Sequence, residues 1–482
     1  MSKETTATCA NCEQLQRQVE TLRQLVEQQQ QSIASLTAQV GILQEKLAAA
    51  AKDSSTSSKP PSSDIVKPPK PAPPPGQGKR QRGGQPGHPK HQRTAFPPEQ
   101  LTVPPHDYCL HCCPVCQGDL LPTDAAPRVV QQIDIRDVPL VIEEHRGHAA
   151  WCPACQVVHY APLPNFVQQG GLAGPRLTTL IAYLKGACHA SFSTIRKYLR
   201  DVVQVSISRG QLAKIIAKVC AALDDPYEEL LKDLRKQPRL NVDETGHKQN
   251  GDRMWTWCFR AKLYTLFKID PTRSGDVLIE VLGKEFDGVL GCDYFSSYRR
   301  YMRECDITLQ FCLAHLIRDV KYLTTLPDWR DRVYGEALSG ALRGLFRVIH
   351  RCGELTEEEF QQQLTQARQR VLSVGLLDAD TQASKAIAQR FAEHGESYFV
   401  FITTPGVEPT NNLAEQAIRF VVIDRHITQG TRSETGNRWC ERIWSVIATC
   451  TQQGRSVFAF LYQAVQAYFH EGAAPSLLPT ES

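Results

Sequence analysis

The first fifty residues follow a seven-residue hydrophobic repeat. One series falls at Cys12, Val19, Val26, Ile33, Val40 and Leu47, and a second, three residues further on, at Leu15, Leu22, Gln29, Leu36 and Leu43. β-branched residues in the first series with Leu in the second favour a parallel two-stranded coiled coil. The pattern therefore predicts dimerisation through residues 9–50, with the polar Gln29 fixing the register. One amphipathic helix packed on its own globular body is the alternative.

The repeat ends near Lys52, where proline becomes frequent. Residues 60–105 contain 14 of the chain's 30 prolines, which predicts an extended linker over 51–105. The net charge of the whole chain is only +4, yet residues 67–100 carry seven Lys or Arg against one acid, Glu99. A flexible basic arm binds phosphates by releasing counterions, so we expect it to contact DNA. The residues expected to do so are Arg80, Arg82, Lys90 and Arg93. A solvated tether is the alternative.

Two cysteine pairs predict a metal module over residues 106–165. They are Cys113-Pro-Val-Cys116 and Cys152-Pro-Ala-Cys155. Four thiolates suit a closed tetrahedral zinc site, which stabilises a segment too short for a core of its own. Residues 129–135 and 138–142 between the pairs are expected to be strands, as in a zinc ribbon. Cys109 and Cys112 form a neighbouring pair, so which pair binds zinc stays open.

Residues 170–235 are predicted to be helical, with helices over 172–188, 194–203 and 208–222. Their spacing fits a helix-turn-helix, whose second helix enters the major groove of DNA. Three-helix units without any role on DNA are equally common, so both interpretations stay open.

After Pro238 the pattern changes to short apolar strands that end in acids. Strands are expected at 239–245, 254–259, 263–269, 288–293 and 308–311, with a helix near 276–282. Asp243 and Asp293 come at the ends of two of these strands, and a pair of facing carboxylates suits Mg²⁺ or Mn²⁺. Glu244 is expected on the opposite face of its strand, because side chains alternate.

A long helical segment follows and leads to a third acid. Helices are expected at 316–326, 329–350, 356–374 and 380–393, and an asparagine is expected to cap a further helix that begins near Asn412. Glu415 in its first turn can return a third carboxylate to the two aspartates, with Arg419 one turn further along the same face. Cys312 and His315 are two ligands only, too few for a metal site, and a packing or DNA-contacting role is expected for them.

These motifs together resemble the bacterial insertion-sequence sixty-six family of transposases over nearly the whole chain. The matching stretches are residues 83–88, both cysteine pairs, Val242-Asp-Glu-Thr245, Cys292-Asp-Tyr-Phe-Ser-Ser-Tyr298, Cys312-Leu-Ala-His315 with Arg318, residues 411–419, Arg425-His426 with Gly430, and the tail 443–461. The resemblance implies a DDE transposase with an RNase H-like α/β core over 236–470 and a helical insertion at 316–405. Asp243, Asp293 and Glu415 fall on the family's catalytic positions.

The expected chemistry is phosphodiester cleavage and strand transfer with two divalent metal ions. Asp243 would bridge both ions, while Asp293 and Glu415 would each hold one. Arg419, Arg425 and His426 are expected to contact phosphates. The expected partners are double-stranded DNA, at element ends and at the target, a second copy of the chain or a higher oligomer, and accessory proteins of the same element. A non-catalytic DNA-binding regulator and a domesticated RNase H-like nuclease are the alternatives.

The remaining composition narrows the class of protein. No apolar segment resembles a signal peptide or reaches the ~18 uncharged residues of a membrane helix. The 17 cysteines, many of them in pairs, fit a reducing cytoplasm in which thiols bind metal, and not a secreted disulfide scaffold.

Overall fold

The computed structural model describes residues 10–50, 97–100, 104, 117, 140–152, 154 and 157–479. The N-terminal repeat forms one helix, α1 (Ala10–Ala50). Its apolar heptad residues from Leu15 to Leu47 are exposed, with Val19 at 47% and Leu47 at 72%. An exposed apolar stripe of this length fits the predicted coiled coil, which stays a prediction. A short 3-10 helix, η2, covers Pro98–Gln100.

The predicted zinc module is described only at its end. Strands β1 (Ala149–Cys152) and β2 (Val157–Tyr160) pair antiparallel, with Cys152 opposite Val157. Cys113, Cys116 and Cys155 lie outside the described residues, as do Cys109, Cys112 and the four basic residues named in the arm, so both predictions stand untested. The strand expected at 138–142 is wrong over its described part. Residues 140–142 have no regular structure, because Val141 and Ile142 expose 86% and 88% of their surface and so gain no burial.

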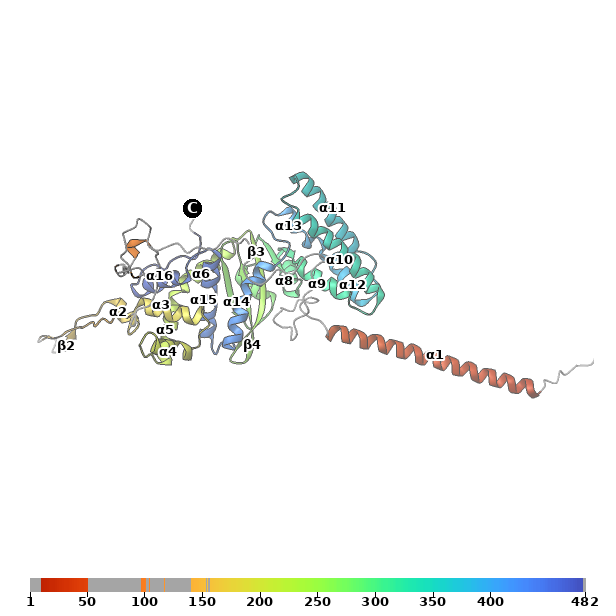
Figure 1. Cartoon of the computed structure of the whole chain (residues 1–482), viewed down its shortest axis with the longest axis horizontal. Coiled ribbons are helices and arrows are strands. Elements are labelled where there is room, and N and C mark those ends of the chain that lie inside the picture. The colour runs from red at the N-terminus through yellow and green to blue at the C-terminus, as the bar shows by residue number, and fades with distance from the viewer. Residues whose placement is uncertain are drawn as a thin grey trace, which may run out of the picture. The chain divides into compact units, whose positions relative to one another are not determined.

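The segment before the sheet is helical, as expected. It contains α2 (Asn165–Gly170), α3 (Pro175–Gly186), α4 (Phe192–Asp201), α5 (Arg209–Ala222) and α6 (Asp224–Leu234). Ser208 begins α5, and its side chain accepts the Gln211 backbone N–H. Helices α3 and α5 pack on each other and on α16 (Val457–Phe469), near the C-terminus (Figure 1). Helix α16 thus joins residues near the C-terminus to the helices that precede the sheet.

A five-stranded mixed sheet forms the centre of the protein. Its order is β5-β4-β3-β6-β7, with β3 (Arg239–Gln249), β4 (Asp252–Arg260) and β5 (Thr265–Asp270) antiparallel. Strands β6 (Val289–Cys292) and β7 (Thr308–Phe311) run parallel to β3. Helices α7 (Gly275–Leu282) and α8 (Ser296–Cys305) connect the strands. This mixed sheet with its helices is consistent with an RNase H-like DDE core.

A group of helices is inserted between β7 and the helix that carries Glu415. It comprises α9 (Leu313–Leu323), α10 (Trp329–His350), α11 (Glu357–Gly375), α12 (Gln382–His394), η3 (Gly395–Tyr398) and α13 (Val400–Thr403). The chain then enters α14 (Asn412–Thr428). The Leu313 N–H donates to the Pro409 carbonyl at 3.0 Å, so the insertion leaves and rejoins the core at one point.

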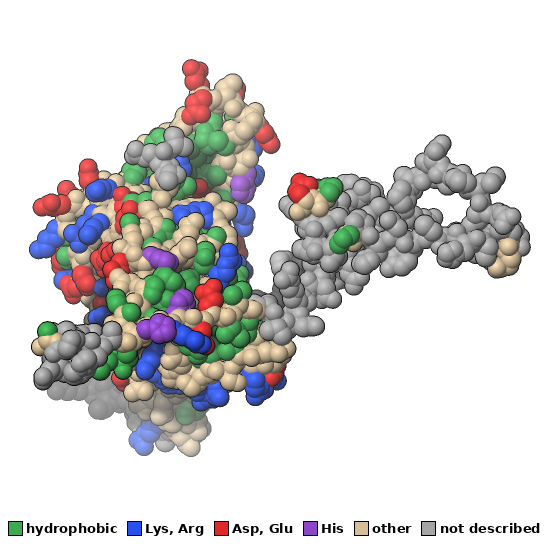
Figure 2. Space-filling view, turned by 90° about the vertical axis from the view of Figure 1, so that its left-hand side faces the viewer, with side chains coloured by type: hydrophobic (Ala, Val, Ile, Leu, Met, Phe, Trp, Pro, Cys, Tyr) green, Lys and Arg blue, Asp and Glu red, His purple; other side chains and the backbone are tan. Residues whose placement is uncertain are grey.

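Charged side chains are mixed over the face shown in Figure 2, where Lys and Arg lie among Asp and Glu. No helix within the described ranges is long and apolar enough to cross a membrane.

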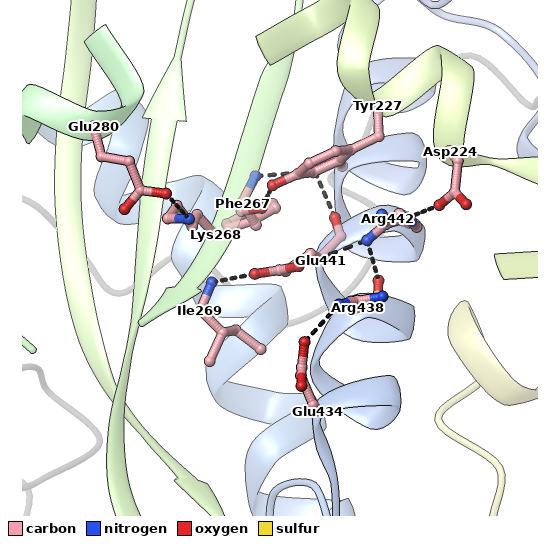
Figure 3. Close-up of polar contacts among 11 residues, drawn as sticks. Asp224, Tyr227, Phe267, Lys268, Ile269, Glu280, Glu434, Arg438, Glu441 and Arg442 are labelled. Atoms are coloured by element: carbon pink, nitrogen blue, oxygen red, sulfur yellow. Dashed lines mark hydrogen bonds and ion pairs between the residues drawn. The ribbon is translucent and has the colours of Figure 1, made fainter. Parts of the chain in front are cut away.

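Helix α15 (Glu434–Gln452) closes the β5 edge of the sheet (Figure 3). The backbone N–H groups of Ile269, Phe267 and Thr265 donate to side chains of α15 at 2.7, 2.9 and 3.1 Å. Their acceptors are Glu441, Ser445 and Thr449 in turn. Two strand residues advance about 6.8 Å and four helix residues about 6 Å, so the two spacings match. An edge that would otherwise be open to another strand is thereby covered.

Candidate active site

Asp243 lies on β3, and Asp293 directly follows β6, the neighbouring parallel strand. Asn241 of β3 pairs with Gly291 of β6. Two residues further along, Asp243 of β3 is level with Asp293, which directly follows β6, and the charge of Asp293 acts on Asp243. Adjacent strands are about 4.8 Å apart, so the two carboxyl groups are neighbours.

The pKa of Asp243 is raised well above its usual value. Burial is the main cause, and the negative charges of Glu244, Asp293 and Glu415 add to it. The Glu244 backbone N–H, which donates to Asp243 Oδ1 at 3.0 Å, partly opposes the shift. A carboxyl group in such a position binds a proton or a cation far more readily than one in water.

Asp293 directly follows β6 and is held by the next turn. The Phe295 backbone N–H donates to Asp293 Oδ1 at 2.9 Å. Burial, followed by the charge of Glu244, raises the pKa of Asp293 to about 7, although the Phe295 N–H and the Arg273 charge act against the rise. When no cation is present, burial and neighbouring negative charge thus favour the uncharged form of both acids more than water does.

Glu415 reaches this place from the first turn of α14, as the sequence predicted. An asparagine, Asn411, occupies the N-cap position as predicted, but its side chain makes no capping hydrogen bond. Its amide donates to the Val242 carbonyl at 2.7 Å and accepts from the Asn241 amide at 2.9 Å. A Cβ at Gly291 would lie 2.6 Å from the Asn241 amide nitrogen, so a glycine there leaves room for this contact. Asn411 therefore fixes α14 on β3 instead of capping it.

Glu244 is bound on the opposite face of β3, as expected from strand alternation. Its buried side chain accepts hydrogen bonds from Arg273 at 2.6 Å and from the Tyr298 hydroxyl. The Arg273 guanidinium also stacks 3.6 Å from the centre of the Phe295 ring. The Glu244 carboxylate is thus occupied by two donors and is not available to a metal ion beside Asp243.

The described residues contain one group of three close metal-binding side chains, and it includes Glu415. Its members are Cys312, His315 and Glu415, whose ligand atoms all lie within 4.8 Å of one another. The three predicted acids do not make such a group in the described part of the chain. In a two-metal site the ions are about 3.5–4 Å apart, so ligands of different ions are spaced more widely.

The predicted DNA-contacting residues on α14 occupy different environments. Arg419 and His426 are exposed. Arg425 is half-buried and donates to the Thr245 hydroxyl at 3.0 Å and to the Gly246 carbonyl. Burial lowers the pKa of Arg425. Arg425 therefore binds α14 to β3, and Arg419 and His426 are the members of this set that face solvent.

Sequence analysis did not identify a cavity that begins at Tyr294, the residue after Asp293, and is lined by two arginines and one glutamate. The cavity measures about 560 Å³, and its lining includes Tyr294, Arg299 and Arg390. The two guanidinium groups lie 4.5 and 4.7 Å from the centre of the Tyr294 ring. Arg299 comes from α8 and Arg390 from α12, separated by about ninety residues, so no local motif could link them.

Comparisons with known proteins identify the family of this chain. Residues 170–438, more than half of the chain, match the model of the Transposase IS66 family, and residues 4–94 match a family of unknown function (DUF6444). Two uncharacterized proteins of Sinorhizobium fredii (strain NBRC 101917 / NGR234) are similar: y4jD is 24% identical over 65% of this chain, and y4hP is 23% identical over 62%. The matches cover 66% and 60% of the lengths of those relatives. The chain belongs to the IS66 family of transposases.

Proposed function

We propose that this protein is a metal-dependent DNA transposase that cuts the ends of an insertion sequence and joins them to target DNA. Family membership supports the reaction class. The observation that carries the proposal is the pairing of Asn241 with Gly291, because that register makes Asp243 and Asp293 neighbours. Glu415 faces them from α14, and its charge raises the pKa of Asp243.

The donor set of this site fits magnesium or manganese. Asp243, Asp293 and Glu415 offer carboxylate oxygens only, which hard divalent cations prefer. Asp243 would bind both ions, with Asp293 on one and Glu415 on the other. The bound ions supply activation of water or of a 3′-hydroxyl and stabilisation of the leaving oxygen.

The chain's own residues fix the positions of these three acids. The Phe295 N–H holds Asp293, and Asn411 attaches the start of α14 to the backbone of β3 at Val242. Arg318 donates a hydrogen bond to Glu415 Oε1 at 3.4 Å, which orients that carboxylate. Glu244 accepts hydrogen bonds from Arg273 and Tyr298 on the other face of β3 and so leaves the position beside Asp243 open to cations.

We assign DNA contacts to the exposed Arg419 and to the half-buried Arg299 and Arg390 near these acids. Arg419 lies one helical turn beyond Glu415, and Arg299 and Arg390 line the cavity beside Asp293. Guanidinium groups bind phosphates through paired hydrogen bonds. The basic arm with Arg80, Arg82, Lys90 and Arg93 would add affinity that depends on salt. Dimerisation through the exposed heptad residues of α1 would bring two such sites to two DNA ends.

The test uses the full chain, labelled element-end DNA and Mg²⁺. Asp243→Asn should reduce strand cleavage by roughly 10³-fold or more, because a ligand to both ions is lost. Asp276→Asn is the control, since Asp276 of α7 is an exposed acid paired with Arg300 of α8 and its loss should leave cleavage within about twofold.

Three outcomes separate the proposal from its rivals. Unchanged cleavage by Asp243→Asn contradicts the assigned site. Wild-type protein that binds the DNA but cuts nothing with either Mg²⁺ or Mn²⁺ is a regulator. Cleavage without any joined product, when target DNA is supplied, identifies a nuclease.

A further inference from the structure

Cys312 and His315 stand beside Glu415 although about one hundred residues separate them in sequence. Cys312 is the last residue before α9, and His315 lies in the first turn of that helix. The return of the insertion to the core places α14 against this turn, where the Asn411 N–H donates to Cys312 Sγ at 3.1 Å. Sequence analysis found two ligands here, and the fold adds the third.

His315 carries a buried nitrogen that the described residues leave without a hydrogen-bond partner. The residue is 8% exposed, and its Nδ1 makes no hydrogen bond within the described part of the chain. The nearest acid oxygen is Glu415 Oε1 at 3.7 Å, beyond hydrogen-bonding distance. Leaving a buried polar nitrogen unpaired is unfavourable, so a ligand at this position would stabilise it. A metal ion bound by Nδ1 and Oε1 would fill that gap.

The three donor atoms differ from those of the proposed catalytic site. Sulfur, imidazole nitrogen and carboxylate oxygen together favour zinc, whereas magnesium prefers oxygen alone. The ligand atoms already lie within 4.8 Å of one another. Tetrahedral zinc with bonds of about 2.0–2.3 Å needs separations of roughly 3.5 Å, which small side-chain movements achieve. Three protein ligands would leave the fourth position open to water.

We propose that Cys312, His315 and Glu415 form a zinc site that shares Glu415 with the catalytic carboxylates. The metal binding stands on the geometry of these three residues. Its consequence for activity rests on the proposed function, because zinc bound at this site would withdraw Glu415 from the Mg²⁺ position. Excess zinc is therefore expected to inhibit Mg²⁺-dependent cleavage.

The test of binding measures the zinc that the full chain retains after incubation with excess zinc and gel filtration, without DNA or Mg²⁺. Wild type should hold one more equivalent of zinc than Cys312→Ala or His315→Ala, and Co²⁺ loading should show a thiolate charge-transfer band that Cys312→Ala weakens. Cys450→Ala is the matched control, because Cys450 is equally buried but lies on α15 away from these ligands. The cysteines of residues 106–165 are present in every variant, so their zinc cancels in the difference.

Equal zinc content in wild type and in both variants overturns the site. Thermal unfolding monitors folding, and His315→Gln, which keeps a polar side chain of similar size, replaces any alanine variant that fails to fold. Asp243→Asn separates the two proposals, because it should retain this zinc while losing cleavage. If Asp243→Asn cleaves normally, the proposed function fails and the zinc difference still decides the metal site.

The test of the consequence adds zinc to the cleavage reaction. His315→Ala should need at least about tenfold more zinc for the same fractional inhibition, measured against its own activity without zinc. Equal sensitivity of His315→Ala and wild type would contradict the sharing of Glu415.

Discussion

Helices α14 and α15 each direct a glutamate at the central sheet, and the two glutamates have different surroundings. Glu441 of α15 accepts the Ile269 backbone N–H at 2.7 Å and completes a covered sheet edge (Figure 3). Glu415 of α14 accepts no backbone N–H among the hydrogen bonds of the described residues, and its charge raises the pKa of Asp243. An acid matched to a backbone donor supports the fold. An acid grouped with other acids is available to a cation.

The largest expected difference between Glu415 and Glu441 is in their effect on DNA cleavage. Glu415→Gln should lower cleavage by roughly 10³-fold, because an amide is a poor ligand for the metal ion that the carboxylate would hold. Glu441→Gln keeps an acceptor for Ile269 and should cleave within about twofold of wild type. The measurement is single-turnover cleavage of end-labelled DNA. Equal losses of cleavage in both variants would contradict the different roles given to Glu415 and Glu441.

The next largest effect is on stability at the β5 edge. Thr449→Val keeps the side-chain shape but removes the acceptor of the Thr265 N–H, so the free energy of unfolding should fall by about 1–3 kcal/mol. Thr451→Val on the same helix removes only a bond to the Ile447 carbonyl at an exposed position. It should change the free energy by less than about 0.5 kcal/mol. Denaturant unfolding checks both, and similar values for the two would refute the role given to the edge.

The acids around Glu415 should make Mg²⁺ binding depend on pH. The pKa of Asp293 is raised to about 7 by burial, whereas an unfolded Asp titrates near 3.9. Without metal the folded chain binds the extra proton between these values, so this group costs stability as pH rises through them. Mg²⁺ displaces the proton, and its affinity should rise about tenfold per pH unit below 7.

The thermal shift that Mg²⁺ produces should therefore be larger at pH 8 than at pH 6. Asp293→Asn should lose most of this difference, while Glu441→Gln should keep it. A shift independent of pH in wild type would show that Asp293 is already charged at pH 6.

The smallest effect is expected at the exposed end of α15. Arg438 pairs with Glu434 one turn away, and both side chains are more than half exposed. Arg438→Ala should lower the free energy of unfolding by less than about 0.5 kcal/mol. A loss above about 1 kcal/mol would mean that this pair belongs to the covered edge together with Glu441.

Much of the fold was predictable because local patterns and tertiary packing agree. The seven-residue repeat predicted α1, and the apolar runs that end in acids predicted β3 and β6 together with Asp243 and Asp293. Helix α10 has the predicted limits, Trp329–His350. Glu415 was predicted as a third acid from its place in a helix.

The predictions that failed or were missing depend on contacts between distant residues. The Asn411 side chain resembles a cap in sequence, but β3 offers it a carbonyl at Val242 and an amide at Asn241. Cys312 and His315 gain a third potential ligand only after the chain returns from the insertion. The polar residues Glu441, Ser445 and Thr449 recur every four positions, a helical spacing that does not reveal which strand they cover.

The hydrogen bond between Leu313 and Pro409 allows the insertion to change without moving the three carboxylates. Because the two ends of this excursion are tied together at 3.0 Å, the distance from β7 to α14 does not depend on how much chain lies between them. Lengthening a loop between fixed ends costs little free energy, about 0.6 kcal/mol per doubling. Relatives could therefore enlarge, shorten or replace α10–α12 and so change what the protein binds, while Asp243, Asp293 and Glu415 keep their geometry.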